Sequence, residues 1–368
     1  MKYNETLEFV ALCLTLSSDE KSVSKIHTLI HNIDWDSVVK VSTAHFVFPA
    51  MYIQLKKAGF LEYIPVELVA YMEHIFELNK ERNEAILNQI ENITRILNKE
   101  NITPIFTKGT SHLLDHLYFD IGERMVGDID LLIPKEQIQQ AENLLFENDY
   151  QHFFEGKDNF QPENHRHLPR LVNDVEIAAV EIHKEMLEEK HASFFNYNSI
   201  KNTLKEINFR GTKLYVPSDE HQLVLNAVSL QLNDYGYYSG KIILRNMYDL
   251  LLLSNKVNSL KAIQKYPEIF NYLNAYLAIS KKVFSNHKSI IFQKNIASKF
   301  YQYRCFLFLN SRKLTLLKNN IEISARIIKK SYLHISRPIL RVQLFQKLRS
   351  KSWRKKKVIA IKKAGKKL

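Results

Sequence analysis

Two aspartates, Asp128 and Asp130, stand two residues apart at the start of the apolar run DIDLLI. On a β-strand, residues i and i+2 project from the same face, so the two carboxylates lie side by side while Ile129, Leu131 and Ile133 face the core. Adjacent carboxylates raise each other's pKa unless a cation neutralises them. A hard divalent ion, Mg²⁺ or Mn²⁺, neutralises them well and also binds phosphate oxygens. The pair therefore predicts a metal site for chemistry at phosphorus.

A third carboxylate is expected from a neighbouring strand. The apolar segment VEIAAVEIH, residues 175–183, predicts such a strand, and Glu181 follows its apolar run at a depth comparable to that of the aspartates. His183 shares a face with Glu181. Two plainer interpretations stay open, in which Glu181 is a solvent-facing strand acid and His183 is bonded to a structural neighbour.

The tripeptide Lys108-Gly109-Thr110 comes where a predicted strand turns into a helix. Such a turn presents backbone N–H groups and a helix N-terminus to an anion. Lys108 is expected to hold a triphosphate, and the Thr110 hydroxyl adds a further donor. A lysine before a glycine is common in loops, so this signal gains its weight from the nearby aspartates.

Two arginines allow two interpretations each. Arg124 is close enough in sequence to Asp128 to reach a phosphate, but a salt bridge to Glu123 or Asp120 fits equally well. Arg245 and Asp249 have the i, i+4 spacing of neighbours on a helix surface, which favours an ion pair over a contact with a nucleotide base.

The surrounding pattern predicts an α+β chain. Glycine and proline are scarce, at nine each, which favours helices. Apolar residues recur at helical spacing before residue 100 and after residue 218, with Ser218 as an N-cap, whereas short apolar bursts between them are typical of strands. We expect a small mixed β-sheet core flanked by helical regions. The predicted division is residues 1–100 (N-terminal helical region), 101–215 (core), 216–345 (C-terminal helical region) and 346–368 (basic tail).

Composition limits where the protein works. The two cysteines, Cys13 and Cys305, have no CxxC partner, which is typical of buried thiols in a reducing cytoplasm. The N-terminal apolar run contains Glu8 and lacks a basic leader, so it predicts an amphipathic helix and not a signal peptide. We expect a soluble, cytoplasmic protein.

The net charge of +13 is concentrated at one end. Residues 311–368 hold 19 of the 52 basic residues and one of the 39 acidic ones, so this segment carries +18 and the rest of the chain −5. Residues 350–368 contain Trp353 among lysines and arginines. Three interpretations stay open for this tail, namely contact with nucleic acid, contact with an anionic membrane surface, and a solvated end.

The segment FTKGTSHLLDHLYFDIGERMVGDIDLLI resembles the core of the DNA-polymerase-β-like nucleotidyltransferases, above all the branch of uncharacterised nucleotidyltransferases. The motifs that carry the resemblance span about residues 102–185. Two departures are the threonine after the glycine, where serine or glycine is usual, and a glutamate as the third acid, where aspartate is common. The resemblance implies that catalysis and metal binding lie with Asp128, Asp130 and Glu181, and nucleotide binding with Lys108, Gly109, Thr110, Arg124 and His183.

The implied activity is metal-dependent transfer of a nucleoside monophosphate from an NTP such as ATP to a hydroxyl acceptor. The acceptor is left open among an RNA end, a protein hydroxyl, a small molecule and a saccharide intermediate. Two alternatives come from other functional classes. One is a catalytically inactive nucleotide-binding protein that acts through its helices and tail, and the other is a helical interaction protein without a metal.

Overall fold

A computed structural model of the chain describes residues 1–16, 20–153, 166–187, 191–311, 314 and 349. The chain divides into two compact units, residues 1–305 and 306–368, and the second lies almost wholly outside the described residues. The fold discussed here is therefore that of the first unit. The helical signal predicted between 315 and 345 and the basic tail at 350–368 also lie outside the described residues.

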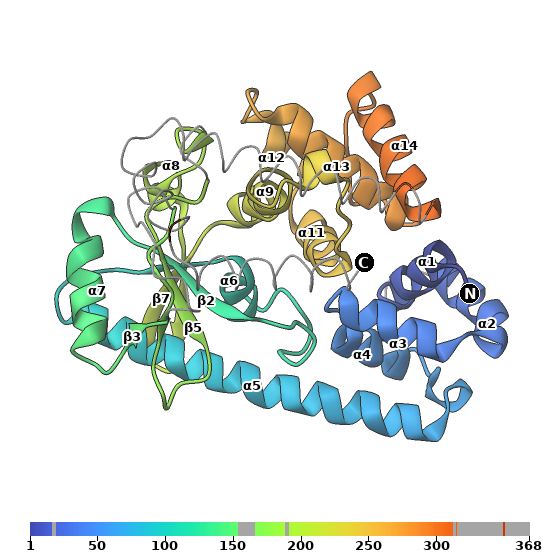
Figure 1. Cartoon of the computed structure of the whole chain (residues 1–368), viewed down its shortest axis with the longest axis horizontal. Helices are drawn as coiled ribbons and strands as arrows, with labels where there is room; N and C mark the ends of the chain where they lie inside the picture. The colour runs from blue at the N-terminus through green and yellow to red at the C-terminus, as the bar shows by residue number, and fades with distance from the viewer. Residues whose placement is uncertain (17–19, 154–165, 188–190, 312–313, 315–348, 350–368) are drawn as a thin grey trace. The chain divides into compact units, whose positions relative to one another are not determined.

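The described strands form one mixed sheet in the order β3-β4-β5-β2-β1-β7-β6 (Figure 1). The central strand β2 pairs antiparallel with β1 and parallel with β5, and β1 pairs parallel with β7. The predicted α+β class is confirmed. The strands are β1 (Ile105–Thr107), β2 (Asp128–Leu132), β3 (Gln151–His152), β4 (Leu171–Val172), β5 (Ala179–His183), β6 (Lys205–Phe209) and β7 (Thr212–Val216).

The hairpin of β6 and β7 was not predicted from the sequence. Its two-residue turn is Arg210-Gly211, and both residues have left-handed φ angles of 52° and 83°. Such turns match the twist of paired strands, and glycine adopts them without strain. The alternation of polar and apolar residues on both sides of Arg-Gly is the signal that identifies this hairpin.

Five helices precede the sheet. Pro65 lies immediately before the longest, where a missing N–H costs nothing. Asn101, with φ 56°, lies just beyond its end, and the Ile102 N–H bonds back to the Leu97 carbonyl. The helices are α1 (Tyr3–Cys13), α2 (Glu20–Leu29), α3 (Trp35–Ala44), α4 (Phe48–Lys57) and α5 (Val66–Asn98), with 3₁₀ turns η2 (Ile30–Asn32) and η3 (Leu61–Tyr63).

The long helix α5 runs along one face of the sheet, as Figure 1 shows. Its apolar residues share a buried core with β1, β2, β5, β7 and helix α7 (Ile138–Phe146). The members from α5 are Ile86, Leu87, Ile90, Ile93 and Leu97. Because strand residues alternate in direction, the polar residues between these core positions on β2 and β5 point to the opposite face.

Helices also follow the sheet and lie on its other side in Figure 1. Ser218 caps α9 by accepting a hydrogen bond from the His221 N–H, as predicted, and Asn258 caps α12 in the same way. The helices are α9 (Asp219–Val228), the π-helix η8 (Ser229–Asn233), α10 (Gly236–Ser239), α11 (Leu244–Lys256), α12 (Ser259–Gln264), α13 (Phe270–Val283) and α14 (Ile296–Asn310). The remaining short elements are α6 (Lys108–Leu114), η4 (Lys135–Gln137), α8 (Tyr197–Ile200) and η7 (Lys201–Thr203).

Two further sequence expectations concern burial and membranes. Both cysteines, Cys13 and Cys305, are buried as predicted. Among the helices of the described residues, none combines the length and the apolar character needed to cross a bilayer.

Candidate active site

Strand register brings two of the predicted acids together. In the parallel pair of β2 and β5, Asp130 lies opposite Glu181, and Asp128 lies opposite Ala179. Asp130 and Glu181 are 3% and 5% exposed, whereas Asp128 at the strand end is only half-buried. Three carboxylates thus share one face of adjacent strands, in a setting where their charges are poorly screened.

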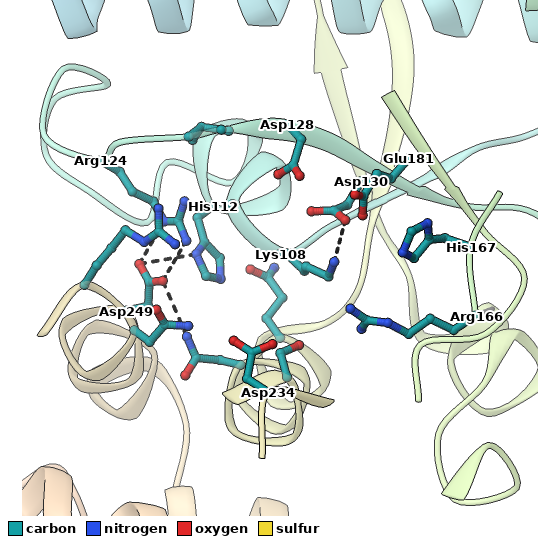
Figure 2. A pocket seen from close by; sticks show the side chains of 18 of the residues that line it. Lys108, His112, Arg124, Asp128, Asp130, Arg166, His167, Glu181, Asp234 and Asp249 are labelled. Carbon is teal, nitrogen blue, oxygen red and sulfur yellow. Dashed lines mark hydrogen bonds and ion pairs between the residues drawn. The ribbon is translucent and has the colours of Figure 1, made fainter. Parts of the chain in front are cut away.

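Three side chains bond to the two inner acids. The Lys108 Nζ lies 2.5 Å from Asp130 Oδ1, and the His183 Nε2 lies 2.7 Å from the same oxygen. The Arg170 Nε donates to Glu181 Oε1 at 2.7 Å. Figure 2 shows Lys108 pointing at Asp130 beside Glu181. Each buried negative charge therefore has a partner, which buried ions require.

The outer acid, Asp128, is held differently. Arg170 Nη2 donates to its Oδ2 at 3.1 Å, so one guanidinium bridges Asp128 and Glu181. Burial, together with the charges of Asp130 and Glu181, nevertheless raises the pKa of Asp128. Burial also opposes ionisation of Asp130, but the charge of Lys108 and the hydrogen bond from His183 hold its pKa below the usual value.

Glu181 behaves like Asp130. Burial works against its charge, but the hydrogen bond from His183 and the charges of His167, Lys108 and Arg170 hold its pKa well below the usual range. Asp130 and Glu181 are thus held in their charged forms, and the cost of the third negative charge falls on Asp128.

The donor set fits a hard divalent cation. Ligand atoms of Asp130, Glu181 and His183 lie within 4.8 Å of one another, the one such group among the described residues. Carboxylate oxygens are the ligands that Mg²⁺ and Mn²⁺ prefer, and Asp128 adds another at the open side. Because the His183 Nε2 already bonds Asp130, this imidazole orients a carboxylate and stays off the pocket wall.

The first residue of α6 has an unusual backbone. Lys108 has a left-handed φ of 55°, which is uncommon for a residue with a side chain and clusters at functional sites. A Cβ on Gly109 would lie 2.3 Å from the Arg124 Nη1, so only glycine leaves room for that guanidinium. Thr110 is fully buried and donates to the Asp128 carbonyl at 3.4 Å, away from the pocket.

Arg124 is anchored by an acid 125 residues away. Its Nε and Nη2 donate to the two oxygens of the fully buried Asp249 at 2.9 and 2.8 Å. Tyr118 donates to Asp249 as well, at 2.6 Å, and His112 Nδ1 lies 3.4 Å away. Burial disfavours the charge of Asp249, but the charge of Arg124 holds the pKa of this carboxyl far below its usual range.

The predicted ion pair of Arg245 with Asp249 is wrong. Arg124 takes both oxygens of that carboxylate, and Arg245 instead donates to the Met125 carbonyl at 2.9 Å, with its guanidinium over the Phe46 ring. The alternative salt bridges of Arg124 to neighbouring acids in the sequence are likewise absent from the described contacts. For both arginines, contacts with segments distant in sequence determine the bonding partner, and local spacing does not.

Polar residues of α5 hold the loop that leads into β2. The Asn79 and Asn83 amides donate to the carbonyls of Gly122, Ile121 and Arg124. Farther along the helix, Gln89 forms two hydrogen bonds with the backbone of Ala178, next to β5. The helix thereby fixes both strands that carry the acids.

The three acids line a pocket of about 390 Å³, together with Lys108 and Arg124, and this size suits a nucleotide. In Figure 2, Asp249 and Arg124 lie at one end, and Asp130, Glu181 and Lys108 lie at the other. Gly109 lines the wall as well, whereas Thr110 does not. The wall contributed by α9, η8, the residue after η8 and α11 includes the polar residues Gln222, Asn226, Ser229, Asp234, Arg245 and Asn246.

Sequence reasoning missed several lining residues. Arg166 and Arg170 lie in a polar segment that carried no motif. Asn226 lies in a helix whose sequence showed only a core pattern, and Asp234 comes directly after η8. The spacing of Gln222, Asn226 and Ser229 by four and three is the one signal available, because it places three polar side chains on one helix face.

Comparison with known proteins gives a family. A family model described as "Uncharacterised nucleotidyltransferase" matches residues 31–269, well over half of the chain. No curated protein sequence matches. A solved structure, the crystal structure of an antigenic nucleotidyltransferase-like protein from Paracoccidioides brasiliensis, is 15% identical over 50% of this chain and 90% of its own, with a TM-score of 0.31. At that TM-score the likeness carries no argument.

Removing the carboxylate of Asp249 should destabilise the fold. Asp249→Ala leaves the buried Arg124 without a counter-charge, which costs about 3–5 kcal/mol of unfolding free energy in urea titrations. Asp234→Ala, at an exposed aspartate of the same helical region, should change it by less than about 0.5 kcal/mol. A loss below 1 kcal/mol for Asp249→Ala would show that the ion pair is not needed for stability.

The raised pKa of Asp128 predicts a pH-dependent gain in stability for a neutral replacement. A raised folded-state pKa means that ionisation destabilises the fold, fully above the folded pKa and not at all below the unfolded value. Metal-free Asp128→Asn should therefore melt roughly 1–3 °C higher than wild type at pH 7, and the gain should shrink as the pH approaches about 4.

Calorimetry at several pH values, in the presence of a chelator, measures this gain. Asp174→Asn, at an exposed aspartate outside the pocket, is the matched control and should melt like wild type. A lower melting temperature for Asp128→Asn at pH 7 would mean that the bridge to Arg170 outweighs the repulsion from Asp130 and Glu181.

Proposed function

The chain belongs to the family of uncharacterised nucleotidyltransferases, as its motifs predicted, and on this premise we propose that it transfers a nucleoside monophosphate from an NTP to a hydroxyl acceptor. The observation that carries the proposal is the group of three carboxylates, Asp128, Asp130 and Glu181, on one face of two paired strands at a polar pocket. In-line displacement at phosphorus uses such acids to hold divalent cations.

In the proposed reaction, the acceptor oxygen forms a bond to the α-phosphorus of the NTP. The bond from that phosphorus to the oxygen bridging to the β-phosphate breaks, pyrophosphate leaves, and the acceptor hydroxyl gives up its proton. We assign Asp128, Asp130 and Glu181 to hold Mg²⁺ or Mn²⁺. When bound, the ion supplies charge neutralisation of the phosphate oxygens and acidifies the acceptor hydroxyl.

The chain's own groups prepare the site for a polyanion. Lys108 and Arg166 line the pocket and offer positive charge to phosphate oxygens. His183 donates to Asp130 from a fully buried position, which fixes that carboxylate's orientation. Arg124 is assigned an indirect part, because its Nε and Nη2 are bonded to Asp249 and its packing on Gly109 shapes the turn that carries Lys108.

The wall formed by α9, η8 and α11 is assigned to the nucleoside or the acceptor, since its amides and hydroxyl are suited to hydrogen bonding with uncharged polar groups. The supply of NTP and the two buried thiols favour the cytoplasm as the place of reaction. The acceptor remains one of the four classes that carry a hydroxyl, namely RNA, protein, small molecule or saccharide intermediate.

A thermal-shift panel tests this proposal. The full-length protein is melted with ATP, GTP, CTP or UTP, with and without Mg²⁺ or Mn²⁺. A nucleotide at about 100 times its Kd should add about 2.7 kcal/mol, a rise of several degrees. The rise should require metal, and Asp130→Asn should lose it while Asp174→Asn keeps it.

Two other outcomes decide between the alternatives. A folded wild-type protein that no nucleotide stabilises would contradict the proposal. Metal-dependent stabilisation without pyrophosphate release in the presence of pooled RNA, protein and small-molecule acceptors would support a nucleotide-binding protein that has lost turnover.

A further inference from the structure

Arg170 belongs to a segment whose backbone is tied down on both sides. The Leu168 N–H donates to the Ile182 carbonyl at 2.9 Å, and Leu171 pairs with Val180 of β5. The Arg170 carbonyl itself accepts from the Phe153 N–H at 2.8 Å. The backbone of Arg170 is therefore fixed beside the acids, and only the conformation of its long side chain is free to change.

The guanidinium of Arg170 occupies the open side of the carboxylate group. It donates from Nε to Glu181 Oε1 at 2.7 Å and from Nη2 to Asp128 Oδ2 at 3.1 Å. The side chain of Arg170 is 51% exposed, whereas those of Lys108 and His183 are 23% and 0% exposed. Of the three side chains bonded to the acids, Arg170 is thus the most exposed and the easiest to move.

A divalent cation needs the same carboxylates that Arg170 bonds, through one oxygen of each. A guanidinium bonded to Glu181 and Asp128 would place its positive charge a few ångströms from the ion, and the two cations would repel in a partly buried site. The ion and the bridging form of Arg170 therefore compete. When Arg170 is released from these acids, its backbone still holds it at the pocket. Arg166 lines the same pocket, and its backbone is also fixed, because its carbonyl accepts from the Lys184 N–H at 2.8 Å.

We propose that Arg170 neutralises Asp128 and Glu181 in the metal-free protein and is displaced from them by the divalent metal. The displaced Arg170 side chain then binds the polyphosphate of the incoming nucleotide. This inference rests on the proposed function. If Arg170 acts in this way, metal and nucleotide bind cooperatively. The metal alone must break the two Arg170 bonds, whereas the nucleotide offers the freed guanidinium several phosphate oxygens as acceptors. Arg170 is in this account a specificity element for metal–nucleotide over metal alone.

The test compares Arg170→Gln with wild type in the full-length protein. Mn²⁺ binding without nucleotide, followed by electron paramagnetic resonance, should tighten roughly three- to tenfold, because the competing cation is gone. At saturating Mn²⁺, binding of an ATP analogue with a methylene group between the α- and β-phosphates should weaken roughly tenfold. The two opposite shifts distinguish displacement from a structural role, which would weaken both.

The matched control is Arg95→Gln. Arg95 is 61% exposed, pairs with the single acid Glu91 and lies outside the pocket, so the change removes the same charge without touching the site. Its Mn²⁺ and analogue affinities should equal those of wild type. Arg170→Lys, which keeps the charge but loses the planar fork, should fall between wild type and Arg170→Gln for both ligands.

Failure of this inference and failure of the proposed function look different. If wild type binds Mn²⁺ and the analogue but Arg170→Gln binds Mn²⁺ with unchanged or lower affinity, displacement is overturned and the proposed function stands. An unchanged affinity for the analogue would overturn the polyphosphate contact. If wild type binds neither Mn²⁺ nor the analogue, the proposed function fails and the inference fails with it.

Discussion

The repulsion among three carboxylates on two neighbouring strands is the constraint on which the rest of the site depends. The parallel register of β2 and β5 places Asp130 directly beside Glu181, and the period of a strand adds Asp128 on the same face. Such a group is stable only when positive charges and hydrogen-bond donors lie beside it. Lys108 and His183 contact Asp130, and Arg170 contacts Glu181 and Asp128. The left-handed backbone conformation of Lys108 belongs to the same arrangement, because it occurs at the residue whose ammonium group contacts Asp130.

A second buried charge pair links this site to the helices that follow the sheet. Asp249 on α11 accepts from Arg124, which lies in the loop before β2, and Arg124 packs on Gly109 at the start of α6. Helix α5 holds the same loop from the other face through Asn79 and Asn83. The position of the acids is thus fixed by elements from three parts of the chain, all of which lie within the residues that the family model matches, 31–269.

Local patterns in the sequence predicted the fold class, the strands β2 and β5, and the acids that they carry, because strand period and apolar burial are visible within five residues. They failed where the partner is distant in sequence. Helical spacing favoured an Arg245–Asp249 pair, but Arg124 takes that carboxylate from 125 residues away. The bridge from Arg170 to two acids depends on how the segment before β4 lies on β5, and the sequence around Arg170 carries no periodic signal for it. Buried polar contacts of this kind follow from tertiary packing and not from spacing.

We propose above all that the three acids hold a divalent cation that binds the phosphates of a nucleotide in the adjoining pocket. The most direct measurement is anomalous scattering at the manganese edge from crystals grown with Mn²⁺ and a non-hydrolysable ATP analogue. We expect a manganese peak within coordinating distance of Asp128, Asp130 and Glu181, with the triphosphate in the pocket lined by Lys108 and Arg166. A nucleotide bound in this pocket without manganese at the acids, or manganese and nucleotide bound at a different place, would contradict this proposal.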